Sequence, residues 1–323
     1  MSITEESWDG ELAERASPAP LLQTWGWGEV QSRAGWTVER IRLPGGSMAS
    51  VQLRRVGPTR EAYVPRGPVP ATADSISAIA DWARSAKVAA LTVEPEAGPE
   101  LGESLVAGGF TAVPQTQPQH TRIVRLGPAD EMLAAFKHGR RYNIRTGLKR
   151  GAIVDEGAEA DELERQSAAV ERRESIHLPA ASYSRLLLEL LPWSRTFVAR
   201  DPETREALAA VLVARHDGRA YHLFAGRTGG RPELMGNDLA WWAGMRAAAE
   251  AGDRDYDLWG VPPPGAGPDH PWAGLGFFKA EYGGEEVAYA GAWRLAISAA
   301  GSRLIDLERK ARGRIRGLKR NIS

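Results

Sequence analysis

The stretch that decides the fold is Tyr256-Asp-Leu-Trp-Gly-Val-Pro-Pro-Pro-Gly-Ala-Gly-Pro-Asp-His-Pro-Trp-Ala-Gly-Leu-Gly-Phe-Phe-Lys-Ala-Glu-Tyr-Gly-Gly-Glu285. Residues 256–261 alternate aromatic or apolar side chains with small or polar ones, which predicts a buried strand. Three consecutive prolines end that strand, because proline has no N–H for the ladder. The loop that follows delivers Lys279 into a short helix, which the glycine pair 283–284 ends. A rigid strand that presents a polar loop and one lysine is the arrangement that a functional site needs.

The Gly- and Pro-rich loop inside this stretch carries three side chains of types that loops rarely keep without a role. These candidates are Asp269, His270 and Trp272. Lys279 follows the apolar pair Phe277 and Phe278. We expect its side chain to end in an exposed ammonium. The alternative is an ordinary surface lysine whose stem lies along the phenylalanines.

Composition limits the class of protein. The chain has 323 residues, of which 43% are hydrophobic, enough for one large domain or two ordinary ones. Its formal net charge is zero, so any attraction to nucleic acid or membrane must be local. It has no cysteine, which excludes disulfides and thiol catalysis. Neither a signal peptide nor a membrane span is evident, so we expect a cytoplasmic protein, with peripheral contact at the inner membrane face left open.

The two halves of the chain have the same order of predicted elements. Residues 1–20 are expected to be a polar lead-in, and residues 21–36 have helical spacing. The first half continues with strands at 38–43 and 49–56, a helix at 75–86, a strand at 88–93 and a helix near 99–107. The second half has strands at 195–200, 207–215 and 219–226, a helix at 239–252, and the 256–261 strand. This repetition predicts an α/β fold of two tandem units in the manner of the GNAT acyltransferases, at 21–136 and 137–300, followed by a basic helix at 301–323.

Two segments carry local positive charge. Six basic residues and no acid lie in the predicted hinge at 137–150, where Arg141, Arg145 and Lys149 share one helix face. The C-terminal segment 303–320 contains eight basic residues against two acids, including Arg314, Arg316 and Lys319. Both segments could simply be helix faces exposed to solvent. Alternatively, they bind a polyanionic partner, an interpretation that we favour because few acids are present to pair with these cations.

The signatures of several enzyme classes are absent from the sequence. There is no Gly-x-Ser-x-Gly elbow, no His-Glu-x-x-His pair and no Walker loop. We therefore expect no metal, no ATP and no other cofactor. Acyl transfer from an activated ester needs none of them: it needs positioning, a neutral amine nucleophile and a donor to the developing oxyanion. Lys279 is the candidate for that donor.

Four segments, in the same order as in the family, resemble the Fem family of aminoacyl-tRNA-dependent transferases, which build the interpeptide bridge of peptidoglycan. They begin with Leu22-Gln-Thr-Trp-Gly-Trp-Gly-Glu-Val30, Tyr63-Val-Pro-Arg-Gly-Pro-Val69 and Arg141-Tyr-Asn-Ile-Arg-Thr-Gly-Leu-Lys-Arg-Gly151, and the stretch from 256 to 285 is the fourth. Together they cover most of the chain. The resemblance implies two GNAT-like domains with the acceptor between them.

The resemblance also implies roles for individual residues. Lys279 would be the catalytic lysine, since the family's lysine follows a phenylalanine, here Phe278. Arg173 would bind the diphosphate of the precursor, with Arg172 as the alternative in register. The further substrate-binding candidates are Arg66, Glu94, Tyr221, Phe224, Asp269, His270, Trp272 and Phe278. Core packing is an equal reading for Tyr221 and Phe224, and Gln31 stands where the family has a phosphate-binding lysine.

The expected reaction is transfer of an aminoacyl group from tRNA to the side-chain amine of a soluble or lipid-linked peptidoglycan precursor, by a monomer. The basic residues at 137–150 and in the tail would contact tRNA phosphates, or an anionic membrane surface in the case of the tail. One rival is an acetyl-CoA-dependent N-acyltransferase, whose phosphate loop Arg227-Thr-Gly-Gly-Arg-Pro232 matches only in part. The other is a non-catalytic RNA-binding protein on a transferase fold.

Overall fold

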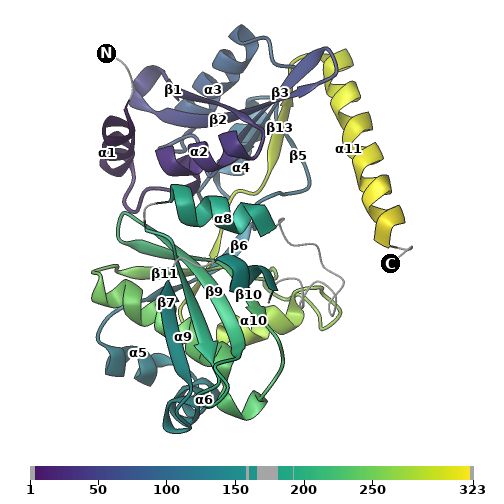
Figure 1. Ribbon diagram of the computed structural model, residues 1–323. Coiled ribbons are helices and arrows are strands. Elements are labelled where there is room, and N and C mark those ends of the chain that lie inside the picture. Colours follow the sequence, from purple (N-terminus) through teal and green to yellow (C-terminus); the bar gives the residue numbers. More distant parts are fainter. Residues whose placement is uncertain (1–3, 158–159, 166–180, 192, 321–323) are drawn as a thin grey trace. The chain divides into compact units, whose positions relative to one another are not determined.

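The computed structural model describes residues 4–157, 160–165, 181–191 and 193–320, and it divides into two compact units (Figure 1). Unit 1 comprises residues 1–119 and 288–323, and unit 2 comprises residues 120–287. Each unit contains one mixed sheet with helices packed on it, which confirms the predicted α/β class. Within the described part of the chain, no helix is both long and apolar enough to cross a membrane.

The sheet of unit 1 has the strand order β1-β2-β3-β4-β13-β5. Its strands are β1 (Thr37–Arg42), β2 (Met48–Val56), β3 (Thr59–Pro65), β4 (Ala90–Glu94), β13 (Trp293–Ala296) and β5 (Thr111–Ala112). Only β3 and β4 run parallel to each other. The other neighbouring strands are antiparallel.

The helices of unit 1 are α1 (Glu5–Arg15), α2 (Trp25–Arg33), α3 (Ala73–Ser85), α4 (Leu101–Ala107) and α11 (Ala299–Arg320), with short 3-10 turns η1 (Leu21–Gln23) and η2 (Pro44–Gly46). The core forms where Ile76 and Ile79 of α3 pack on apolar side chains of β2, β3 and β4. Helix α11 joins this unit through Ile305, which packs against Val56 and Ala89. Thr72 caps α3, which begins two residues before its predicted start at residue 75.

The sheet of unit 2 has the strand order β12-β6-β11-β10-β9-β8-β7. Its strands are β12 (Glu285–Ala288), β6 (His120–Arg125), β11 (Asp255–Gly260), β10 (Arg219–Arg227), β9 (Ala207–His216), β8 (Arg195–Arg200) and β7 (Ile153–Gly157). Here β10 and β11 are the parallel pair. Four further pairs are antiparallel: β6 with β11, β10 with β9, β9 with β8, and β8 with β7.

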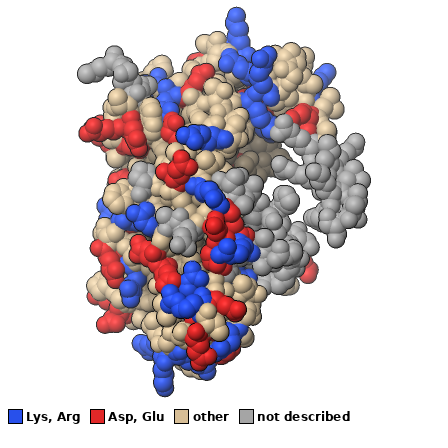
Figure 2. Space-filling model, viewed as in Figure 1, with Lys and Arg blue, Asp and Glu red and all other residues tan. Residues whose placement is uncertain are grey.

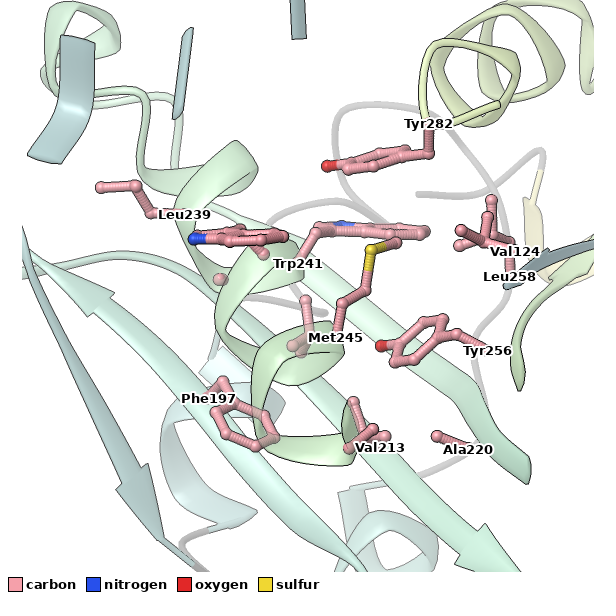
Figure 3. Close-up of a cluster of buried hydrophobic side chains, with 14 of the residues drawn as sticks. Val124, Phe197, Val213, Ala220, Leu239, Trp241, Met245, Tyr256, Leu258 and Tyr282 are labelled. Atoms are coloured by element: carbon pink, nitrogen blue, oxygen red, sulfur yellow. The ribbon is translucent and has the colours of Figure 1, made fainter. Parts of the chain in front are cut away.

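The helices of unit 2 are α5 (Ala129–Ala135), α6 (His138–Lys149), α8 (Ala181–Leu190), α9 (Gly236–Glu250) and α10 (Ala273–Ala280), with the 3-10 turn η3 (Pro232–Leu234). Helix α9 packs on β8, β9 and β10 and is apolar on most of its faces. Figure 3 shows Trp241 and Met245 of this helix among Phe197, Val213 and Tyr256 from the sheet. The ring of Tyr282 stacks on Trp241, with centroids 5.6 Å apart.

The repetition predicted from the sequence appears as a shared strand–helix–strand unit. In unit 1, β3 leads through α3 to the parallel strand β4, and in unit 2, β10 leads through α9 to the parallel strand β11. A parallel pair needs such a crossover, since a tight turn can join only antiparallel strands. The glycine turns that follow, at 108–109 and 283–284, end α4 and α10.

The two sheets exchange strands along the sequence, which differs from the domain boundary predicted between residues 136 and 137. Strand β6 precedes that boundary but pairs with β11 in the second sheet. Strand β13 lies within the predicted second domain but pairs with β4 in the first sheet. Each parallel pair therefore has, as its neighbour, a strand from the other part of the chain, and periodicity in the sequence carries no information on such long-range pairing.

The N-terminal segment also differs from its prediction as a polar lead-in. It forms α1, which begins with a capping box between Thr4 and Ser7. Trp8 and Leu12 lie one turn apart and are fully buried, and the indole N–H of Trp8 donates to the carbonyl of Gln23 at 2.8 Å. Two apolar residues at i and i+4 are enough to anchor a short helix, although they leave little periodic signal among its charged residues.

Gly284 offers a test of the turn that joins α10 to β12. It has a left-handed φ of 75°, and a Cβ at this position would clash with the backbone carbonyl of Ile123 on β6. Gly265 has nearly the same φ, 77°, with open space around its Cβ position. Both Ala variants should lose about 1–2 kcal/mol from the left-handed conformation. Gly284→Ala should lose several kcal/mol more in urea unfolding, and equal losses would contradict the clash.

Candidate active site

The parallel strands of unit 2 separate soon after they meet. β10 and β11 pair over three positions, ending at Tyr221 opposite Asp257. Beyond that point β10 continues along β9 with a bulge between His222 and Phe224, while β11 continues along β6 to Gly260. The facing edges of the two strands are no longer joined by a ladder there. Bulges and separated strands re-aim side chains, which makes this end of the sheet the first place to look for chemistry.

The end of β11 is bent by a local hydrogen-bonded turn. Trp259 has a φ of 62°, a left-handed conformation that is uncommon for a bulky residue. The carboxylate of Asp257 accepts a hydrogen bond from the Trp259 N–H at 2.7 Å. It also accepts a short hydrogen bond from the hydroxyl of Thr121 on β6. The register of β11 against β6 shifts between Asp257 and Gly260 as a result.

Lys279 reaches this turn from helix α10. Its Nζ donates to the Gly260 carbonyl at 2.7 Å, and the residue is only 4% exposed. The expectation of an exposed ammonium is therefore wrong. The two phenylalanines before it do not form one apolar shoulder: Phe278 packs edge to face on Trp241, whereas Phe277 is 71% exposed. Lys279 follows Phe278 inward because the core takes that face of α10.

Burial changes the protonation of Lys279. Removal of the ammonium from water lowers its pKa to about 7, and the negative charge of Asp257 acts in the opposite direction. Near neutral pH, both the ammonium and the free amine are therefore present. The ammonium can donate to a developing oxyanion, and a group with a pKa near the working pH can also exchange a proton readily.

His222 lies buried beside Lys279 and is neutral. Burial lowers its pKa well below the ordinary value, and the positive charge of Lys279 lowers it further. Its ring stacks on Trp241 with centroids 3.5 Å apart, and its Nδ1 lies 3.3 Å from the hydroxyl of Tyr256. Because burial raises the pKa of Tyr256, that hydroxyl keeps its proton and can donate it to Nδ1. His222 thus adds no second charge to the site.

Arg140 of α6 holds α10 in place, a role that the sequence did not suggest. This buried arginine forms an ion pair with Asp238 of α9. Its guanidinium carbon lies 4.1 Å from the ring centroid of Phe278 and 4.8 Å from that of Tyr282. The backbone N–H of Lys137 also donates to the carbonyl of Glu281 at 2.9 Å. In the sequence Arg140 is one of six basic residues in a segment without acids, and nothing else there distinguishes it from the other five.

Of the residues predicted in unit 2, several lie at or near the separated strands. Tyr221 is buried, and its ring contacts that of Trp259 edge to face at 6.2 Å. Phe224 contacts Tyr183 in the same manner at 6.4 Å. Phe278 is the neighbour of Lys279 and packs in the core. The packing reading of Tyr221 and Phe224 agrees with these contacts, and their role toward substrate stays a prediction.

The loop before α10 keeps its predicted polar residues at the surface. Asp269 and Trp272 are exposed, and His270 is partly buried. The Nδ1 of His270 accepts a hydrogen bond from the backbone N–H of Trp272 at 3.1 Å, so this histidine helps to form the turn that starts α10. No group of three or more His, Asp or Glu side chains able to hold a metal occurs among the described residues.

Arg66 of unit 1 is buried and has protein partners. It has a left-handed φ of 54°. Its Nη2 donates to the carbonyl of Pro118 at 2.7 Å, and its guanidinium lies 4.1 Å from the ring centroid of Tyr289. These contacts hold the segment that leads out of the first sheet. A substrate role for Arg66 stays a prediction.

Glu94 of unit 1 is likewise buried, at the end of β4 where the sequence places it. Its carboxylate accepts hydrogen bonds from the Tyr63 hydroxyl at 2.7 Å and from the backbone N–H groups of Thr116 and Gln117 at 2.6 and 2.8 Å. Burial, together with the charge of Glu94, raises the pKa of Tyr63. Glu94 thus caps the loop that contains Thr116 and Gln117, and its role toward substrate stays a prediction.

The predicted phosphate contacts fall in three places. Arg173 and its alternative Arg172 lie outside the described residues. Arg141 of α6 donates to the carbonyls of Ala134 and Phe136, while Arg145 and Lys149 are exposed. The remaining predicted contacts lie toward the end of α11, where the structure describes the helix but not these side chains: Arg314, Arg316 and Lys319.

Solved structures identify the fold. The chain has the tandem GNAT fold: it superposes on the tandem GNAT protein of the clavulanic acid biosynthesis pathway with a TM-score of 0.53 at 15% identity, covering 91% of this chain and 96% of that one. The C-terminal domain of a putative lysylphosphatidylglycerol synthetase from Agrobacterium fabrum gives 0.59 at 15% identity, covering 93% and 94%. No curated protein has significant sequence similarity to the chain.

A family model matches one part of the chain. Residues 193–307, which contain Asp257 and Lys279, match the model of the FemAB family. The crystal structure of FemX agrees in fold, with a TM-score of 0.79 at 19% identity over 91% of this chain and 96% of that one. Both findings confirm the resemblance drawn from the sequence.

The buried lysine predicts a pH-dependent stability. The unfolded chain holds this proton up to about the ordinary lysine pKa of 10.5, whereas the folded protein releases it near 7. The unfolded state binds more protons between these values, so the free energy of unfolding rises with pH across that window. Lys279→Met, whose uncharged side chain is only one atom shorter, lacks this dependence. Its stability advantage should be largest at pH 6 and should shrink by up to about 5 kcal/mol toward pH 10.

Urea unfolding of both proteins from pH 6 to 9.5 measures the difference, in which all other titrating groups cancel. Parallel stability curves would show that Lys279 titrates as an ordinary lysine.

Proposed function

We propose that this protein transfers an aminoacyl group from aminoacyl-tRNA to the side-chain amine of a peptidoglycan precursor peptide. The observation that carries the proposal is Lys279, a buried lysine with a pKa of about 7 at the point where two parallel strands separate. Strongly perturbed ionisable groups cluster at functional sites. The acyltransferase class is supported by the FemAB match over 193–307 and by the tandem GNAT fold.

The reaction forms an amide and releases the tRNA ribose hydroxyl. The neutral amine of the acceptor attacks the ester carbonyl, and negative charge develops on the carbonyl oxygen. The Lys279 ammonium stabilises that oxyanion, and the low dielectric around it strengthens the interaction. When the intermediate collapses, the C–O bond to the ribose breaks and the ribose oxygen takes up the proton that the amine loses. Arg173, or Arg172, is the proposed ligand of the precursor diphosphate.

The start of α9 argues against acetyl-CoA as the donor. In an acetyl-CoA-dependent enzyme the phosphates would bind at this helix N-terminus, after the Arg227–Pro232 loop. Here the first turn of α9 carries its own anion, Asp238, which is paired with Arg140. Gly147 of α6 packs so closely on Leu239 and on the carbonyl of Leu234 that a Cβ would not fit. Protein groups therefore take the place of the phosphates.

The exposed face of α6 is the proposed contact for tRNA in unit 2. Arg145 and Lys149 are exposed, and Tyr142 beside them is 58% exposed. Elsewhere on the face shown in Figure 2, basic and acidic side chains alternate, in agreement with the zero net charge. A local group of cations next to an aromatic ring suits a phosphate backbone with an unpaired base. The basic end of α11 is the second proposed contact, for which an anionic membrane surface remains the competing partner.

Loss of the Lys279 charge should remove most of the transfer activity. We expect Lys279→Met to lower kcat about 10²–10³-fold, since this is the typical effect of removing a donor to an oxyanion. Lys279→Arg should retain part of the activity, because it keeps the charge but misplaces it. Mass spectrometry of the precursor after incubation with mixed charged tRNA measures the transfer. Arg246→Ala, which removes a solvated ion pair on α9, is the control. Full turnover by the Met variant would refute the role of the lysine.

Loss of the α6 cations should weaken tRNA binding in a salt-dependent way. Each neutralised phosphate contributes about 0.9 to the slope of log K against log salt. The double variant Arg145→Ala and Lys149→Ala should therefore flatten this slope by up to about 2 and leave precursor affinity unchanged. Arg84→Ala, an exposed arginine on α3, serves as the charge control. An unchanged slope in the double variant means that this face does not contact the tRNA.

A further inference from the structure

Three polar side chains from three elements meet at the bent end of β11. Asp257 comes from β11 itself, Thr121 from β6 and Lys279 from α10. All three are buried, and Asp257 is 3% exposed. Two of the contacts run through Asp257, and the third joins Lys279 to the carbonyl of Gly260. The roles proposed so far use Lys279 alone.

The position of Asp257 is costly unless it is compensated. Asp257 is 3% exposed, so its carboxylate is withdrawn from water. Burial of a carboxylate costs several kcal/mol unless hydrogen bonds and an opposite charge offset it. The N–H of Trp259 and the hydroxyl of Thr121 supply the hydrogen bonds, and the Lys279 ammonium supplies the charge.

The same carboxylate holds a strained backbone. A left-handed conformation in a residue other than glycine costs about 1–3 kcal/mol, and such strain persists where the surroundings fix it. At Trp259 the fixing contact is the hydrogen bond from its N–H to Asp257. The carbonyl that follows, at Gly260, is the acceptor of the Lys279 Nζ at 2.7 Å. Asp257 therefore sets the direction of the only hydrogen bond recorded for Lys279 in the described structure.

We propose that Asp257 is the positioning residue of the Lys279 site: it fixes the turn whose Gly260 carbonyl receives the lysine, and its charge keeps that lysine protonated for oxyanion stabilisation. This proposal rests on the proposed role of Lys279 in acyl transfer. Asp257 does not touch the reacting atoms and acts through Lys279. The other ionisable group that faces the lysine, His222, is neutral and cannot replace the charge of the carboxylate.

The two parts of this role can be separated by substitution. Asp257→Asn keeps an acceptor oxygen for the Trp259 N–H and removes the charge. Asp257→Ala removes both. Asp255→Asn is the matched control, because Asp255 lies two residues earlier on the same strand and pairs with Arg125 at the surface. The three variants therefore distinguish charge, hydrogen bond and general effects on β11.

Lysine NMR reads the charge directly, because the chain contains only six lysines: Lys87, Lys137, Lys149, Lys279, Lys310 and Lys319. In protein labelled with ¹³C and ¹⁵N lysine, the Lys279 signal is the one missing from Lys279→Met. Its midpoint should lie near pH 7 in the parent protein. Loss of an adjacent opposite charge in Asp257→Asn should lower this midpoint by about 1 or more. Asp255→Asn should leave it unchanged.

Hydrogen exchange at the Trp259 amide tests the turn, and the pH dependence of kcat tests its effect on Lys279. The Trp259 amide should stay protected in Asp257→Asn and exchange faster in Asp257→Ala, since only the former keeps its acceptor. In transfer assays of Asp257→Asn, the decrease of kcat at alkaline pH should begin at a lower pH, because a smaller fraction of Lys279 is protonated at a given pH. The KM for the precursor should stay constant. An unmoved Lys279 midpoint in Asp257→Asn, or an equal movement in Asp255→Asn, would overturn the proposal.

The NMR titration needs no substrate, so it is independent of the proposed reaction. If the midpoint moves as expected but no variant, nor the parent protein, transfers an aminoacyl group, the coupling of Asp257 to Lys279 stands and the proposed function fails.

Discussion

The structure of the second unit depends on one electrostatic constraint: an ammonium group held away from water. The charged form of Lys279 is affordable only because the Gly260 carbonyl and the Asp257 carboxylate lie beside it and His222 stays neutral. Even so, burial lowers its pKa by several units from that of an exposed lysine. A purely structural site has no reason to keep such a group, since an apolar side chain of the same length would fill the space without this cost.

The aromatic layer around α9 makes that constraint effective. Trp241 contacts the rings of His222, Phe278 and Tyr282. Arg140 of α6 lies against the rings of Phe278 and Tyr282. Rings that pack in fixed orientations hold α10 with little freedom, and the lysine on it inherits that rigidity. The basic helix α6 therefore has two faces with different tasks. Arg140 supports the core, whereas Arg145 and Lys149 remain in solvent.

Much of the fold was predictable from the sequence, because its elements have strong local signals. Strands β4, β10 and β11 and the crossover helices α3 and α9 follow from periodicity, prolines and glycines, whereas β3 was missed and the role of Lys279 came from the family resemblance. The burial of Lys279 does not follow from such signals, since the sequence does not say which of two adjacent phenylalanines faces the core. Asp257 was visible as an acid inside an apolar strand, and that contradiction is the signal that could have identified it. Helix α1 and the exchange of strands were hidden because they depend on contacts between distant segments.

The strand exchange has a consequence for the chain during its synthesis. The edge of β4 in the first sheet is covered by β13, which is synthesised about 200 residues after β4. Until then the nascent first unit presents an open strand edge, the kind of surface on which polypeptides pair with the wrong neighbour. A polypeptide cut between the two predicted domains would keep this edge open permanently and would also lose β6 from the second sheet. Neither half of the sequence is thus a self-contained folding unit, although each sheet looks like one.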